Sequence, residues 1–462
     1  MPGSGIKEAL IPLNAFYFNS AITDQFSVEA FYQFEWKASQ AASSGTYFST
    51  SDTFGTGGSR AIAGLTGTAL EPILDIMDTQ LTIDFLNSIL PADLDMGSAG
   101  NTYQENNYHI SVGNRLADEA ADDAGQYGVA LRYIAESLNS TEFGLYFLNY
   151  HSKTPVVAVS SGQPNGLTGS PAAPQLEQAL TPPVFAQVAP VINLISMMSS
   201  ATYRAQFPED IHLYGFSFNT VIGETSFAGE IAYRSNMPMF STYDGNIVAA
   251  TLSTLGIPLA NGLSLDLDQL NSAGQLIGLE NTSGVIQAGD DFVLWDRKSL
   301  LSSSLLAIHN FGPLAFTGLD NLVGILELGF SHVGGLNEKD IFRPGPLSRT
   351  LKTSDPNFDP NLAAENYITS DSWGYQLVLQ GTKNNIFNGI SMSPSIRFKH
   401  DVNGNSHRLG NFAEGRKAHT IALAFNYLDF QANLSATEYY GAGPLNLLRD
   451  RDFASLSFAY AF

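Results

Sequence analysis

The last ten residues, Phe453-Ala-Ser-Leu-Ser-Phe-Ala-Tyr-Ala-Phe462, decide the fold class. Apolar side chains occupy every second position from Ala454 to Phe462, and alanine or serine stands between them. This period of two predicts a β-strand with one apolar face, in a soluble sandwich or in a barrel. A last strand that ends on phenylalanine favours an outer-membrane barrel, whose assembly machinery reads that strand. The candidate assembly signal is Leu456, Phe458, Tyr460 and Phe462.

The same alternation recurs along the chain. Between residues 26 and 37, for example, aromatic and aliphatic side chains from Phe26 to Trp36 alternate with mostly polar ones. In a soluble sandwich the charged face would meet water, whereas in a barrel it lines the lumen and the aromatic face meets lipid. We predict an all-β chain that forms a transmembrane antiparallel β-barrel of about 14 strands, as one domain over residues 1–462. The predicted strands are 10–21, 26–37, 126–135, 142–152, 211–221, 225–235, 292–299, 302–311, 321–333, 372–383, 389–401, 416–427, 429–440 and 452–462.

Composition agrees with this class and excludes others. The 22 Lys and Arg against 44 Asp and Glu give a net charge of −22, yet only 14% of residues are charged. In soluble domains, about a quarter of the residues are charged. No uncharged apolar run reaches the ~18 residues of a membrane helix. Without cysteine, disulfides and thiolate sites are excluded, and so acidic a chain is a poor partner for nucleic acid.

The connections between these strands are very unequal in length. Short turns are predicted at 222–224 and 428–429, and long loops at 38–125, 153–210, 236–291 and 334–371. This alternation is typical of barrels with periplasmic turns and large extracellular loops. Residues 156–183 are expected to be mobile.

Two of the long loops show helical periodicity. Residues 69–90 and 184–198 carry apolar side chains every three or four positions, which predicts short amphipathic helices. Their apolar faces would either pack against the barrel rim or form a vestibule for an apolar solute. The candidate vestibule residues are Leu74, Met77, Leu81, Phe85, Val188, Val191, Ile195 and Met198.

Charged residues on the polar face of the strands are the candidates for the lumen. They would form a structural ion-pair network or line a solute route. They are Glu29, Glu35, Lys37, Arg132, Glu230, Arg234, Glu327, Arg397 and Lys399. We predict no catalytic residues, cofactor or metal site. The adjacent His151 and Ser152 would point to opposite faces of an extended strand, although a Ser–His pair across strands stays open.

Ten stretches of the sequence resemble one proteobacterial outer-membrane family. This family carries a domain-of-unknown-function label, is associated with RND transporters and is similar in character to long-chain fatty acid transport channels. The stretches are FSVEAFYQFEW (26–36), GTYFSTSD (45–52), GQYGVALRY (125–133), EFGLYFLNYHSKTP (142–155), PEDIHLYGFSF (208–218), GEIAYRSNMP (229–238), SWGY (372–375), HDVNG (400–404), EGRKA (414–418) and LLRDRDF (447–453).

The resemblance implies partners and a longer chain. Genes of that family commonly neighbour those of an inner-membrane transporter of the resistance-nodulation-division class and of a periplasmic lipoprotein-like partner. In the family, the segment similar to residues 2–10 follows a signal peptide and further barrel sequence. We therefore expect this chain to lack N-terminal strands.

The leading hypothesis is a channel in the outer membrane of a Gram-negative bacterium that lets hydrophobic or amphipathic small molecules cross. Its expected partners are the lipid bilayer, lipopolysaccharide, the barrel assembly machinery, a periplasmic partner and an RND transporter. The alternative is a docking platform with a closed lumen that serves a periplasmic partner. A lipid-modifying enzyme is the third and least favoured hypothesis.

Overall fold

The computed structural model describes residues 10–43, 45–47, 55–58, 60–64, 109–160, 201–240, 291–293, 295–314, 316–336, 368–407 and 411–460. Within these residues the secondary structure is all β, apart from two 3-10 turns at Glu136–Leu138 and Gly443–Leu445. No helix in these residues is long and apolar enough to cross a membrane. The helices predicted at 69–90 and 184–198 lie outside the described residues.

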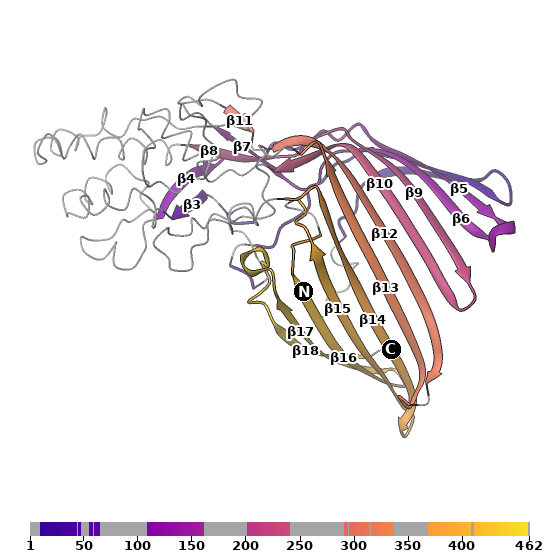
Figure 1. Cartoon of the computed structure of the whole chain (residues 1–462). Helices are drawn as coiled ribbons and strands as arrows, with labels where there is room; N and C mark the ends of the chain where they lie inside the picture. The colour runs from indigo at the N-terminus through magenta and orange to yellow at the C-terminus, as the bar shows by residue number, and fades with distance from the viewer. Residues whose placement is uncertain are drawn as a thin grey trace, which may run out of the picture.

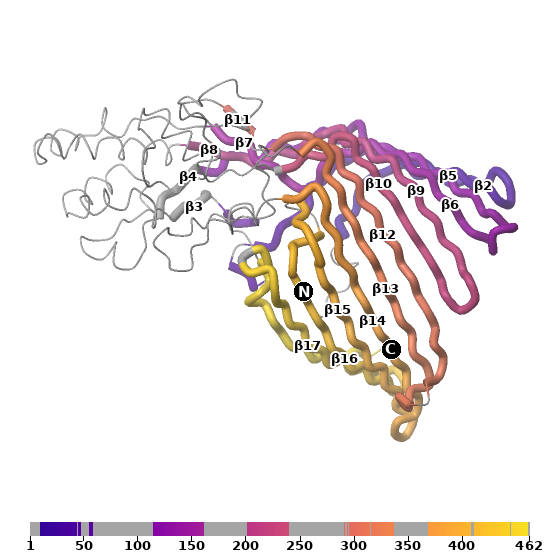
Figure 2. Tube along the Cα trace, in the orientation of Figure 1, coloured from indigo at the N-terminus to yellow at the C-terminus, as the bar shows by residue number. Residues whose placement is uncertain are grey.

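Thirteen strands form one large antiparallel sheet (Figures 1 and 2). In spatial order they are β1 (Ala15–Ala21), β2 (Phe26–Gln33), β5 (Gln126–Ala135), β6 (Thr141–Tyr150), β9 (Ile211–Ile222), β10 (Thr225–Phe240), β12 (Trp295–Leu314), β13 (Leu319–Gly334), β14 (Asp371–Phe387), β15 (Ile390–Asn403), β16 (Lys417–Tyr427), β17 (Phe430–Tyr440) and β18 (Phe453–Tyr460). The prediction of an all-β chain is confirmed. Within the described residues the sheet is open, and β1 and β18 are its edges.

The predicted break between residues 299 and 302 was wrong. Segments 292–299 and 302–311 were predicted as two strands, but residues 295–314 form the single strand β12. The run from Ser302 to Ser304 has no period of two, so the sequence pattern breaks there. The ladder nevertheless continues, because Ser303 pairs with Ile231 on one side and with Phe330 on the other. Pairing on both sides overrides the local pattern.

A second, smaller sheet lies in stretches predicted as loops, except for residues 292–293, which fall in the predicted strand 292–299. It has the order β11 (Asp291–Val293), β7 (Val156–Ser160), β8 (Thr202–Gln206), β4 (His109–Arg115) and β3 (Arg60–Gly64). Its β4 and β8 are parallel, which requires contacts between distant segments. Of the stretch 156–183, which was expected to be mobile, residues 156–160 form β7, which is paired on both sides, and Val156–Val159 are buried. Residues 161–183 lie outside the described residues.

The two ends of the large sheet differ. Short turns, including those predicted at 222–224 and 428–429, join strands at one end. At the first of them, Gly223 adopts a φ of 62°, a left-handed conformation that glycine reaches without strain. All long connections leave from the other end, and Figure 1 shows the second sheet lying beyond it. We call these the short-turn end and the long-connection end.

The strand register gives the large sheet two unlike faces, because neighbouring residues of a strand point to opposite sides. One directly paired row from β2 to β14 is Val28, Leu131, Leu145, Phe216, Ile231, Ser303, Phe330 and Trp373. The row one residue away is Ser27, Arg132, Gly144, Ser217, Glu230, Ser304, Gly329 and Gly374. We call the sides carrying these rows the apolar face and the polar face.

Most large apolar side chains of the apolar face are exposed. Leu145 is 56% exposed, and Phe216, Ile231 and Trp373 are exposed as well. Buried clusters occur instead toward the long-connection end, where Met239, Leu300, Val333 and Ile368 pack together. In the described part of the sheet, the apolar face therefore points outward and the polar face points inward.

Candidate functional site

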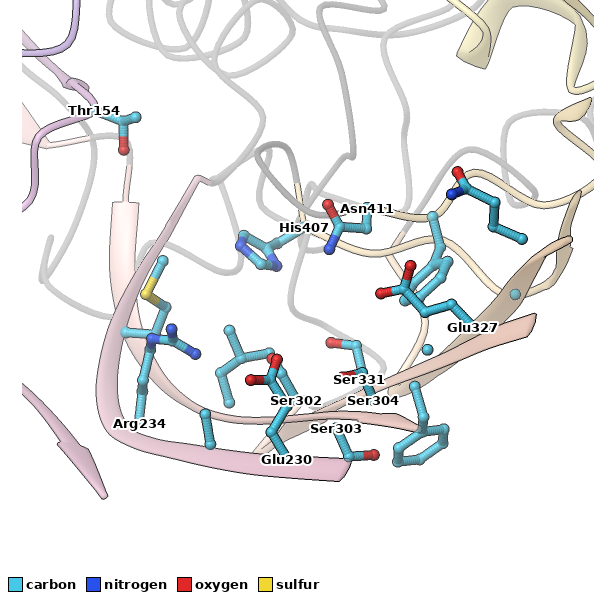
Figure 3. A pocket seen from close by; sticks show the side chains of 18 of the residues that line it. Thr154, Glu230, Arg234, Ser302, Ser303, Ser304, Glu327, Ser331, His407 and Asn411 are labelled. Carbon is cyan, nitrogen blue, oxygen red and sulfur yellow. The ribbon is translucent and has the colours of Figure 1, made fainter. Parts of the chain in front are cut away.

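A cavity of about 650 Å³ lies against the polar face of β10, β12, β13 and β14. In Figure 3, the side chains of Glu230 and Arg234 on β10 and of Ser302 and Ser304 on β12 lie below it. Residues 152–154, after β6, and His407, Asn411 and Phe412, after β15, border it from above. This volume suits a small organic molecule.

Small side chains of the sheet leave the space for this cavity. Ser302 pairs with Ser331, and Ser304 pairs with Gly329, so four adjacent lining positions carry little bulk. A Cβ atom at Gly329 would stand 3.0 Å from Cζ of Phe412. Glycine there lets the Phe412 ring come down to the sheet.

The charges of the cavity are separated along the strands. Glu230 and Arg234 are four residues apart on one face of β10, about 13 Å along the backbone. Arg234 donates from Nε to the Tyr150 hydroxyl at 3.0 Å. In the part of the chain that the structure describes, no carboxylate lies within 4.0 Å of its guanidinium. Glu327 and Lys399 face the cavity on either side of Gln376, with which both pair.

Lys153 brings a further cation to the cavity, from outside the sheet. Its Nζ is buried and has no hydrogen-bond partner among the described residues. Desolvation by burial lowers the pKa of this ammonium group below its ordinary value.

His407 adds an imidazole group to the cavity. Its Nδ1 is buried and lacks a hydrogen-bond partner within the described ranges. Burial, followed by the positive charge of Arg234, lowers the pKa of His407 to about 4. The imidazole is therefore neutral at pH 7.

The upper wall of the cavity is tied to the sheet by Asp401, whose side chain is 0% exposed. Its Oδ2 accepts hydrogen bonds from Nε of Arg416 at 2.6 Å and from the Ala413 N–H at 3.1 Å. Arg416 also donates to the carbonyl of Asn411. The backbone N–H of Asp401 donates to the Arg416 carbonyl at 2.9 Å. These bonds close the connection that carries His407, Asn411 and Phe412.

Seven of the nine candidate lumen charges share the polar face by register. Glu230, Arg234, Glu327 and Lys399 line the cavity. The others on this face are Glu29, Arg132 and Arg397, of which Glu29 and Arg132 form an ion pair at 3.3 Å. Glu35 and Lys37 lie beyond the end of β2 and pair with each other at 2.9 Å.

The sequence did not predict the cavity residues that come from connections. They are Ser152, Lys153, Thr154, His407, Asn411 and Phe412. Only Ser152 falls within a predicted strand, and no spacing or motif marked the others. Tertiary contacts bring them to the sheet.

The vestibule candidates Leu74, Met77, Leu81, Phe85, Val188, Val191, Ile195 and Met198 lie outside the described residues. So does Phe462 of the candidate assembly signal, whereas Leu456, Phe458 and Tyr460 are exposed on β18. These three alternate residues share one side of the edge strand.

His151 has a structural role. Its Nδ1 accepts from the Asp210 N–H at 3.1 Å, and its Nε2 donates to the Ala124 carbonyl at 2.7 Å. Both ring nitrogens are thus occupied, and Ser152 donates from Oγ to the Thr154 carbonyl at 2.7 Å. The described ranges contain no group of three or more His, Asp or Glu side chains that could hold a metal ion.

Comparison with known families gives one match. A family model described as "Protein of unknown function (DUF1302)" matches residues 1–462. No curated protein matches the chain.

Proposed function

The chain belongs to the DUF1302 family along its whole length, and we propose that it is an outer-membrane β-barrel channel for hydrophobic or amphipathic small molecules. The main support for this proposal is that the two faces of the sheet have the opposite arrangement to that of a soluble protein. The apolar face is exposed, and a cavity lies on the polar face.

The apolar face supports a lipid environment. From β2 to β14 its paired row holds aliphatic and aromatic residues at every position except Ser303. Burial of apolar surface is worth roughly 25 cal/mol per Å². Soluble monomers rarely expose contiguous apolar patches beyond a few hundred Å². An apolar band with a polar interior is the arrangement of barrels in outer membranes.

The polar face supports a route for an amphipathic solute. The cavity offers serine hydroxyls and charges of both signs, together with the apolar side chains of Ile211, Met237, Leu300 and Phe412. A molecule with one polar and one apolar end finds partners for both there.

The proposal sets a requirement on the two edges of the sheet. Unpaired N–H and C=O groups of a strand are costly in lipid. In the membrane β1 and β18 would therefore be paired, with each other or with further strands. In this arrangement the short turns face the periplasm, where a periplasmic partner and an inner-membrane transporter would hand over the solute. The second sheet then lies on the side of the lipopolysaccharide.

Flux through liposomes tests the proposal, and the absence of cysteine makes a precise version feasible. Ser304→Cys places a thiol at the cavity, whereas Leu456→Cys places one on the exposed side of β18. We expect the full chain to admit a fluorescent amphiphile into liposomes. A bulky methanethiosulfonate reagent should then reduce this uptake for Ser304→Cys and leave it unchanged for Leu456→Cys.

Two results would contradict the channel. Absence of flux in a folded, reconstituted chain would favour a closed docking platform instead. Flux that the reagent fails to reduce at Ser304→Cys would place the route outside this cavity.

A further inference from the structure

One end of the cavity carries positive charge that no carboxylate of the described residues neutralises. Arg234 and Lys153 both line it, and among the described residues neither has a carboxylate partner. A charge withdrawn from water without a counter-charge is destabilising, so such groups usually have a partner of opposite sign. An anion from outside the chain would neutralise these two groups.

The geometry of Arg234 suits an anionic group with two oxygens. One of its N–H groups, at Nε, donates to the Tyr150 hydroxyl, which fixes the guanidinium at the cavity wall. A guanidinium has five N–H donors in a planar fork that matches carboxylate or phosphate oxygens. In the part of the chain that the structure describes, the donors at its two terminal nitrogens have no partner and remain for a ligand.

Neutral His407 adds a hydrogen-bonding group without adding charge. Its buried Nδ1 lacks a partner in the described part of the chain, and the ring lies at the cavity in Figure 3. A neutral imidazole can donate or accept a hydrogen bond, according to its tautomer.

The acidic residues of the cavity lie apart from this cationic end. Glu230 is four residues from Arg234 along β10, on the same face. Glu327 lies in the next row of the polar face toward the short-turn end. Lys399 belongs to the same row, because both residues pair with Gln376. Their negative charges oppose entry of an anionic group toward the short-turn end and favour its position near Arg234.

Apolar side chains lie around the same cationic end. Leu300 pairs directly with Arg234 across the ladder, and Met237 follows three residues later on β10. Ile211 and Phe412 complete this apolar lining. A bound anion thus has apolar surface next to it for a hydrocarbon tail.

We propose that the cavity selects amphipathic organic anions, with the carboxylate or phosphate headgroup held by Arg234 and Lys153 and the tail placed against Ile211, Met237, Leu300 and Phe412. This inference rests on the proposed function, since it names the class of solute that the channel would accept.

Binding of two matched probes tests the selection. The full chain is placed in nanodiscs of zwitterionic lipid, with empty nanodiscs as the background. The probes are dansyl-labelled undecanoate and a dansyl-labelled undecyl-trimethylammonium, which differ in headgroup charge. Arg234→Gln and Lys153→Met should each raise the Kd of the anionic probe about tenfold or more. The Kd of the cationic probe should stay constant or fall.

Control variants separate charge from folding. Lys383→Met removes a cation that pairs with Asp320 at 2.8 Å away from the cavity, and it should leave both Kd values unchanged. Arg234→Lys keeps the charge and should retain part of the affinity. Melting temperatures of all variants report on folding. Competition by decanoate and by decyl phosphate identifies the preferred headgroup.

The outcomes also separate this inference from the channel itself. Equal binding of both probes, or equal losses of both in the variants, would overturn the anion selection. Liposome flux of both probes without preference would overturn it too, while leaving the channel standing. Anion-selective binding without any flux would support the site and contradict the channel.

Discussion

Replacement of Arg416 by methionine is expected to lower the free energy of unfolding by about 3–5 kcal/mol, because it leaves the carboxylate of Asp401 buried without its closest cation. Asp401 is 0% exposed, and its Oδ2 lies 2.6 Å from Nε of Arg416. The next cation, Nζ of Lys399, lies 3.8 Å from Oδ1. Reversible urea unfolding in lipid vesicles would measure the loss.

A matched control tests whether burial causes this effect. Lys383→Met also removes the cation of an ion pair, but both side chains of the Lys383–Asp320 pair are 39% exposed. Its expected cost is about 0–1 kcal/mol. The double variant Asp401→Asn/Arg416→Met should cost less than the sum of the two single changes, since both break one interaction. Equal costs for Arg416→Met and Lys383→Met would contradict the structural role of Asp401.

An arginine in place of Ile396 is expected to destabilise the membrane-inserted chain by about 2–4 kcal/mol. Ile396 lies in the middle of β15, pairs with Leu379 and Ile421 and is 52% exposed. In water, a charged residue at so exposed a position would cost little. In lipid, the same side chain would have to bend toward the membrane–water interface to keep its charge in water. Urea unfolding from vesicles again gives the value.

The neighbouring position provides the control for this substitution. Ser395 is the residue before Ile396 and points to the polar face, as Arg397 does. Ser395→Arg should therefore cost much less than Ile396→Arg. Similar values for the two, or a negligible cost at Ile396, would contradict lipid contact of the apolar face.

The strands of the large sheet could be predicted because their pattern is local. From Phe453 onward, and in the other predicted strands, the period of two is visible without knowledge of the partners. It failed at Ser302–Ser304, where the pairing of β12 with β10 and β13 decides the structure.

Such local patterns could not predict the second sheet or the cavity. Strands such as β7 and β8 are five residues long, and the pairing of β8 with β4 joins distant segments. Of the cavity, the polar-face charges Glu230 and Arg234 were predicted, since they follow the strand period. Lys153 and His407 were not, because only the folding of the connections brings them to the sheet.

Accessibility of spin labels along β13 tests the central claim, the contact of the apolar face with lipid, most directly. Because the chain has no cysteine, single variants such as Leu326→Cys, Glu327→Cys, Leu328→Cys and Phe330→Cys can each be labelled at one site in reconstituted protein. If the apolar face contacts lipid, labels at 326, 328 and 330 are expected to show strong relaxation by oxygen, which dissolves in lipid. The label at 327 should instead be relaxed by a water-soluble nickel chelate. Relaxation of all four labels by the nickel chelate, without alternation, would contradict the account.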